Sequence, residues 1–166
     1  MRRSDPMESS DLTDAERQSG LRLDGEGRWW HEGQPVLHAG LARALHRWLD
    51  QLPDGRFVVR LDAERYAVVE VEDAPYQVLT VEIERGKAGA RVHLHLSDGT
   101  EEELRYDSLR VGAGNALYCR VKDRFAARLS RSSVHLLGEL IEEHEAGFAL
   151  RAAGKVWPIA DGAVLP

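Results

Sequence analysis

The stretch VEVEDAPYQVLTVEIE, residues 69–84, contains two segments typical of β-strands and an irregular connection between them. Apolar and acidic residues alternate on both sides, which is the period-two pattern of half-buried strands. The alternation stops at EDAPY, where Pro75 lacks the N–H that a sheet ladder requires and favours extended backbone at Ala74. A tight hairpin would favour Asn-Gly or Asp-Gly here. The connection is therefore either an irregular turn or a device that positions Asp73 and Tyr76.

The composition limits the class of protein. The chain has 166 residues, of which 43% are hydrophobic, enough for one ordinary domain or two small ones. A net charge of −6 argues against a general nucleic-acid binder. The single cysteine, Cys119, cannot form an internal disulfide, and no apolar run approaches membrane-spanning length. We therefore expect a cytoplasmic protein whose partners are neither nucleic acids nor membranes.

The first part of the chain predicts a tail followed by strands and one helix. Residues 1–19 are polar and lack apolar periodicity, which predicts a disordered tail. Within residues 37–52, Leu41, Leu45 and Trp48 recur at the spacing of one helix face, and we expect this face to pack on a sheet. Strands are expected within residues 21–36 and 57–71.

The remainder predicts more strands and a second helix. Residues 132–147 have Val134, Leu137, Leu140 and Ile141 at helical spacing, with Ser132 or Ser133 able to cap the start. Strands are expected at 76–85, 90–96 and 103–106, with hairpins that turn at 122–123 and 153–154.

The two ends of the chain follow the same order of elements. Residues 21–71 and 117–159 both give a hairpin, a helix and a further hairpin. This order predicts an α+β fold of two similar halves, each with antiparallel strands and one helix. We expect a first half over residues 20–72 and a second half, with additional strands, over residues 73–166, closely packed on each other.

Three motifs in this order resemble a known family. The chain is similar to the bacterial domain-of-unknown-function family 1285 (DUF1285) over residues 21–159. The motifs that carry the resemblance are GRWWHEGQPV followed by a helix, then VEVEDAPY, then LYCRV with AARLSR followed by a second helix. The resemblance implies a duplicated α+β architecture whose second half is superficially like a pleckstrin-homology fold. It also implies a site for a nucleotide-like molecule between the halves and a signalling role with a protein partner. The family has no established biochemical activity.

A group of arginines near the second helix is a candidate anion site. Arg120, Arg128 and Arg131 lie on or beside the 117–129 hairpin, and Arg131 comes just before a helix that begins near Ser133. A helix start presents free N–H groups and a partial positive charge, which suit an anion. The alternative is a solvated basic strand followed by a serine cap.

The remaining candidates complete this ligand site. Asp73 is expected either to accept hydrogen bonds from a ligand or an arginine, or only to cap a turn. Tyr76 or Trp29 would lie against a ligand ring, although Tyr76 also fits the core. The predicted site therefore holds a small anion between the halves with Arg120, Arg131 and Arg28.

No catalytic constellation can be assembled from the sequence. His93 and His95 share one side of a strand, but a metal site needs a third ligand that the sequence does not mark. Cys119 lacks an identifiable base, and phosphate-loop, dinucleotide and zinc motifs are missing. We therefore expect neither a cofactor nor a metal. The predicted function is a non-enzymatic ligand-binding or regulatory module; the alternative is a protein–protein interaction module without a small ligand.

Overall fold

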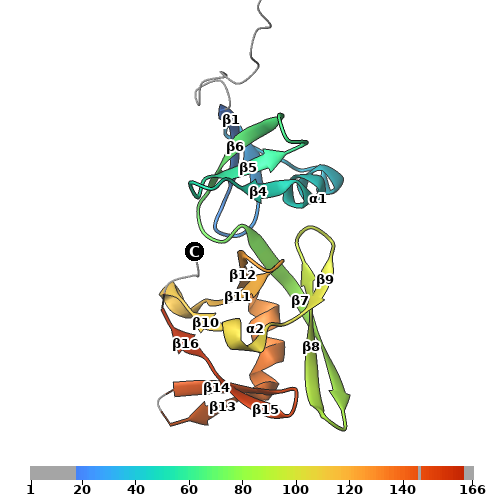
Figure 1. Ribbon diagram of the computed structural model, residues 1–166, viewed down its shortest axis with the longest axis vertical. Coiled ribbons are helices and arrows are strands. Elements are labelled where there is room, and N and C mark those ends of the chain that lie inside the picture. The colour runs from blue at the N-terminus through green and yellow to red at the C-terminus, as the bar shows by residue number, and fades with distance from the viewer. Residues whose placement is uncertain (1–17, 146, 163–166) are drawn as a thin grey trace, which may run out of the picture.

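The computed structural model describes residues 18–145 and 147–162. It is elongated, with the first half at one end and the second half at the other, and the connection between strands β6 (Tyr66–Val71) and β7 (Tyr76–Gly86) leads from one to the other (Figure 1). Mixed β-sheets dominate and two short α-helices accompany them, which fits the predicted α+β class. No helix of the described residues is long and apolar enough to cross a membrane.

The first half is one six-stranded sheet with a helix. Its elements are β1 (Gln18–Leu23), β2 (Trp29–His31), β3 (Gln34–Pro35), α1 (Ala39–Arg47), β4 (Leu49–Gln51), β5 (Phe57–Arg60) and β6 (Tyr66–Val71). The strand order is β3-β2-β1-β6-β5-β4, and β1 pairs parallel to β6. The expectation of antiparallel pairs alone is therefore wrong. Strand β1 begins at Gln18, inside the predicted tail of residues 1–19; residues 1–17 lie outside the described part.

Helix α1 is shorter than predicted. It begins after His38, whose ring nitrogen accepts the N–H of Leu41, and it ends at Arg47. The next residues form strand β4 and pair with β5, because Leu49 can be buried there against Val59. The predicted helix face is only partly right: Leu45 is buried, whereas the side chains of Leu41 and Trp48 are nearly half exposed.

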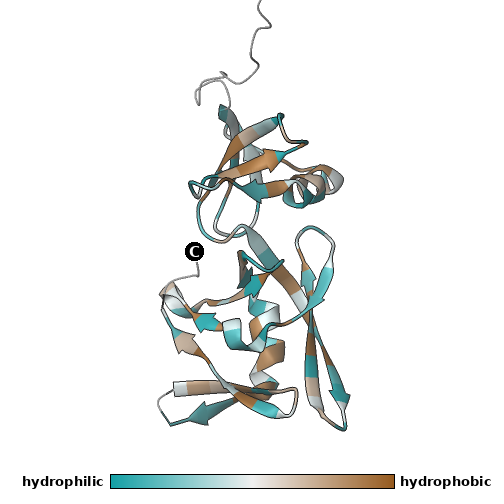
Figure 2. Ribbon diagram, viewed as in Figure 1, coloured by the Kyte–Doolittle hydropathy of each residue, from teal (hydrophilic) through white to brown (hydrophobic). Residues whose placement is uncertain are grey.

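The second half adds strands before and after a second hairpin-and-helix unit. Its further elements are β8 (Gly89–Leu96), β9 (Glu101–Glu103), β10 (Arg110–Val111), β11 (Leu117–Val121), β12 (Phe125–Leu129), α2 (Arg131–Leu137), β13 (Ile141–His144), β14 (Gly147–Ala152), β15 (Lys155–Pro158) and β16 (Ala160–Asp161), with 3-10 turns at Tyr106–Ser108, Ala113–Asn115 and Gly138–Leu140. One sheet has the order β16-β10-β11-β12-β7-β8-β9, and β13-β14-β15 form another. Figure 2 shows hydrophobic residues dominating β5, whereas β9 at a sheet edge is hydrophilic.

Helix α2 also ends earlier than its apolar spacing predicts. The α-helical part stops at Leu137 and continues as one 3-10 turn to Leu140. Ile141 begins β13, which pairs with β14, so its assignment to the helix is wrong. Leu137 and Leu140 are buried as expected, because the turn keeps both on the core side.

One continuous apolar core runs through both halves. It includes Leu23 and Val59 from the first half and Leu94 and Leu129 from the second. Buried residues of the two halves therefore belong to one cluster.

Buried aromatic rings occupy the junction between the halves. Trp29 Nε1 donates a hydrogen bond to Nδ1 of His46 at 2.8 Å, and the Tyr76 hydroxyl donates to the backbone oxygen of His46 at 3.2 Å. The ring of Tyr76 lies 5.4 Å from that of Phe125. Tyr76 and Phe125 belong to the second half, so the backbone oxygen of His46 links the two halves, while its ring is hydrogen-bonded to Trp29 within the first half.

Removing Leu45 should open a cavity beneath α1. Leu45→Ala is expected to lower the free energy of unfolding by about 2–5 kcal/mol, the range for truncating a buried leucine. Leu41→Ala, on the same helix but 46% exposed, is the matched control and should change it much less. Chemical denaturation measures both, and equal losses would contradict the burial assigned to α1.

His46 should make stability depend on pH. Burial lowers its pKa from 6.5 to about 4, against smaller opposing effects from the Ala42 carbonyl and the Asp98 charge. The unfolded chain takes up a proton near pH 6.5 and the folded chain does not, so stability falls as the pH drops from about 6.5 to 4. The added slope approaches about 1.4 kcal/mol per pH unit. His46→Gln should lose this slope in denaturation measured across the range; an unchanged slope would exclude His46 as its source.

Candidate functional site

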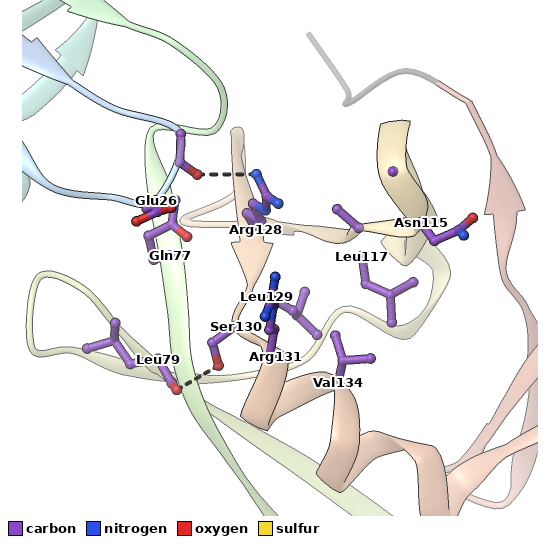
Figure 3. Close-up of a pocket in the computed structure, with 13 residues that line it drawn as sticks. Glu26, Gln77, Leu79, Asn115, Leu117, Arg128, Leu129, Ser130, Arg131 and Val134 are labelled. Atoms are coloured by element: carbon purple, nitrogen blue, oxygen red, sulfur yellow. Dashed lines mark hydrogen bonds between the residues drawn. The ribbon is translucent and has the colours of Figure 1, made fainter.

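A pocket of about 650 Å³ lies where the first half meets the ends of three strands and the start of α2 (Figure 3). The first half contributes the turn after β1, and the second half contributes β7, β11, β12 and α2. The lining residues are Gly25, Glu26, Gln77, Leu79, Gly114, Asn115, Ala116, Leu117, Arg128, Leu129, Ser130, Arg131 and Val134. The wall therefore combines two arginines, the carboxylate of Glu26, neutral hydrogen-bonding groups and apolar side chains.

The start of α2 forms the basic side of this pocket. Ser130, rather than Ser132 or Ser133, is the N-cap: its Oγ accepts the N–H of Ser133 at 3.1 Å and donates to the Leu79 carbonyl at 2.9 Å. Arg131 follows and is exposed, with no hydrogen bond or ion pair to any described residue. Its guanidinium extends from α2 toward the side of the pocket that carries Arg128 (Figure 3).

Arg128 joins the pocket to the connection EDAPY. Its Nη1 donates to the Gly25 carbonyl at 3.2 Å and to Asp73 Oδ2 at 3.1 Å. The Tyr118 hydroxyl donates to the same carboxylate at 2.8 Å, and burial together with Asp73 raises the pKa of Tyr118. Asp73 therefore accepts from an arginine, as one of the two alternatives predicted, and that arginine is Arg128 rather than Arg120.

Three predicted site residues lie in the interior instead of the pocket. Trp29 and Tyr76 are each 2% exposed and bonded to His46, so neither ring can lie against a ligand as predicted. Ser133 is fully buried and donates to the Val78 carbonyl at 3.3 Å. Its hydroxyl fastens α2 to β7 and does not face the pocket, because that turn of the helix packs on the sheet.

The two other predicted arginines are also outside the pocket. Arg28 lies on a neighbouring hollow and is paired with Asp24 at 2.9 Å and Glu26 at 3.2 Å. Arg120 lies on β11, and its side chain has no hydrogen bond to a described residue. Of the seven predicted residues, Arg131 lines the pocket and Asp73 holds one of its arginines.

Gln77 is a pocket residue that sequence reasoning missed. It lies on β7 directly opposite Arg128 in the parallel pairing of β7 with β12. Nothing in the local pattern of β7 marks it, since a polar residue between Tyr76 and Val78 fits ordinary strand alternation. Only the pairing of these distant segments brings its amide to the pocket.

The other candidate groups show no site chemistry. His93 faces Glu84 at 3.1 Å and His95 faces Glu101 at 2.9 Å on the outer side of the β7–β8–β9 sheet. Among the described residues no group of histidine, cysteine and acidic side chains is arranged to hold a metal ion. Cys119 is buried, and burial raises its pKa to about 12.

The architecture is that of an α+β protein dominated by mixed sheets, with a pocket at the junction of two halves. Two solved structures share it, and both are DUF1285 family proteins. The protein from Silicibacter pomeroyi DSS-3 is 20% identical, with a TM-score of 0.73 over 86% of this chain and 80% of that one. The protein from Shewanella baltica OS155 is 18% identical, with a TM-score of 0.58 over 74% of this chain and 93% of that one. No protein-family model and no curated protein matches. The chain thus has the fold of DUF1285 proteins.

Weakening the Asp73 contact should destabilise the junction. Asp73→Asn keeps the shape but removes the charge that Arg128 and Tyr118 share, at an expected cost of about 1–3 kcal/mol in unfolding free energy. Asp107→Asn, an exposed carboxylate, is the control and should leave the melting temperature nearly unchanged. Equal melting temperatures for the two variants would show that Asp73 only completes a turn.

Proposed function

We propose that the chain is a DUF1285 protein and acts as a non-enzymatic ligand-binding module, holding a small anionic, nucleotide-like molecule in the pocket between its halves. The observation that carries the proposal is Arg131, an arginine on the pocket wall with no partner among the described residues. Guanidinium groups pair with phosphate and carboxylate through parallel N–H donors. An unpaired one beside Arg128 provides such donors at the pocket.

The size and lining of the pocket support a small organic anion. Its volume of about 650 Å³ is in the range of small-molecule sites, which are mostly apolar with a few placed polar groups. Leu79, Leu117 and Val134 supply apolar wall for the body of such a ligand. No described histidine or cysteine lines the pocket, so we propose binding rather than catalysis.

We propose that the two halves arose by duplication. A hairpin, a helix and a three-stranded unit occur in each half, which supports a duplication. In the first half these strands join one sheet, whereas β13-β14-β15 form a separate sheet in the second. We also propose, on the resemblance to DUF1285 alone, that the second half is like a pleckstrin-homology fold and that the protein has a role in signalling.

A protein–protein interaction module is the second candidate. An apolar hollow of about 410 Å³ on the first half is lined by Leu21, Trp48, Val59 and Leu61 among others. Trp48 and Leu61 are 42% and 56% exposed. Exposed apolar surface of this kind supports a protein partner.

A thermal-shift screen of nucleotides and phosphorylated metabolites tests the first proposal. A ligand that binds only the folded state raises the melting temperature. Arg131→Gln should weaken any such ligand by about ten- to a hundredfold in calorimetric titration, since it removes charge-assisted hydrogen bonds.

Arg43→Gln is the matched control. It changes the net charge equally at an exposed position of α1 that does not line the pocket, and it should leave affinity unchanged. Equal weakening by both variants would point to a general charge effect. A screen without any shift would favour the protein-interaction alternative.

A further inference from the structure

The side-chain amide nitrogen of Gln77 is buried at the pocket wall without a partner among the described residues. The residue is 7% exposed, and its Nε2 makes no hydrogen bond to any described residue. Its backbone N–H donates to Ser97 Oγ at 3.1 Å, so the strand around it is fully anchored. The unsatisfied group therefore belongs to the side chain alone.

The fold holds this amide in place. Gly27, in the turn of the first half, has φ +83°, and a Cβ there would come within 2.3 Å of Gln77 Cγ. A glycine at this position lets the turn pass directly over the glutamine. The turn of the first half thus packs directly on the side chain of Gln77.

A buried amide without a partner is unfavourable. Leaving a polar group unsatisfied incurs its full desolvation cost, whereas an apolar side chain of the same length would not. Buried polar groups in proteins nearly always have a partner, and exceptions often mark a functional site. Because Gln77 lines the same pocket as Arg128 and Arg131, the missing partner fits a pocket ligand.

We propose that Gln77 is the specificity-determining residue of this pocket: its amide pairs with a carboxamide-like or lactam edge of a ligand whose phosphate or carboxylate pairs with Arg131. This inference rests on the function proposed above and adds the chemistry of the ligand's second contact. One glutamine amide offers one donor and one acceptor side by side, which a lactam edge matches. Sites that hydrogen-bond such a group reject analogues that lack it.

Two phosphate esters distinguish the contact of Gln77 with a lactam edge from the contact of Arg131 with an anion. Uridine 5′-monophosphate carries a lactam edge, and phenyl phosphate carries the same kind of anion on a ring without one. Gln77→Met keeps the length of the side chain and the backbone bond to Ser97 but removes the amide. Calorimetric titration should show it weakening uridine 5′-monophosphate at least about tenfold while changing phenyl phosphate less than about twofold.

The stability of the unliganded protein gives a second readout. Gln77→Met should raise the melting temperature, because the unsatisfied amide is gone. Gln77→Leu should reproduce the loss of discrimination if the methionine variant folds poorly. Gln34→Met, at an exposed position of β3, is the control and should change neither quantity.

The outcomes are distinguishable. If the wild type binds both esters and Gln77→Met binds them with the same affinities, the pocket binds an anion without recognising a lactam edge. This inference is then wrong, while the proposed function stands. A lower melting temperature with unchanged affinity would make Gln77 a structural residue. If neither ester binds to the wild type, the proposed function fails and this inference with it.

Discussion

His46 is the residue on which the placement of the two halves depends. Its ring accepts from Trp29 within the first half, and its backbone oxygen accepts from Tyr76 at the beginning of β7. The imidazole must stay neutral to accept at Nδ1, and its burial keeps it so above its lowered pKa of about 4. Since β7 carries the second half's main sheet, this contact fixes where that sheet begins relative to α1.

The connection EDAPY provides the second fixed point at the same junction. Ala74 and Tyr76 are buried on either side of Pro75, so the segment is an ordered crossing from β6 to β7. The Asp73 carboxylate accepts hydrogen bonds from Arg128 and Tyr118, and Arg128 also donates to the Gly25 carbonyl in the first half. The pocket lies beside this crossing, and its walls from both halves are held by bonds that do not need a ligand.

Local signals predicted local structure well. The turns at Lys122-Asp123 and Ala153-Gly154 lie where the sequence places them, with positive φ at each residue. Both helices end early because Leu49 and Ile141 begin strands, and strand pairing depends on partners elsewhere in the chain. In the candidate site, too, the features that depend on local sequence were predicted, and those that depend on distant pairing were not.

Arg131 was identified because a helix start is a local feature of the sequence. Gln77 was missed because it becomes a neighbour of Arg128 only when β7 pairs with β12, and the sequence does not reveal that pairing. Trp29 was misplaced for a related reason: an indole beside a turn can serve a ligand or the core, and the position of His46 decides between them. Only the three-dimensional pairing supplies that position.

The acidic net charge of the chain is compatible with a basic pocket because many arginines are paired with carboxylates. Some partners lie two to four residues away, as in Arg28–Asp24, Arg56–Asp54 and Arg65–Asp62. The last two pairs are exposed and add little stability, but their charges cancel each other's field over short distances. Arg131 has no such partner among the described residues, so its charge remains available at the pocket. Arg128 bridges the halves through Asp73 and Gly25, and any group that contacts it in the pocket therefore also acts on the junction.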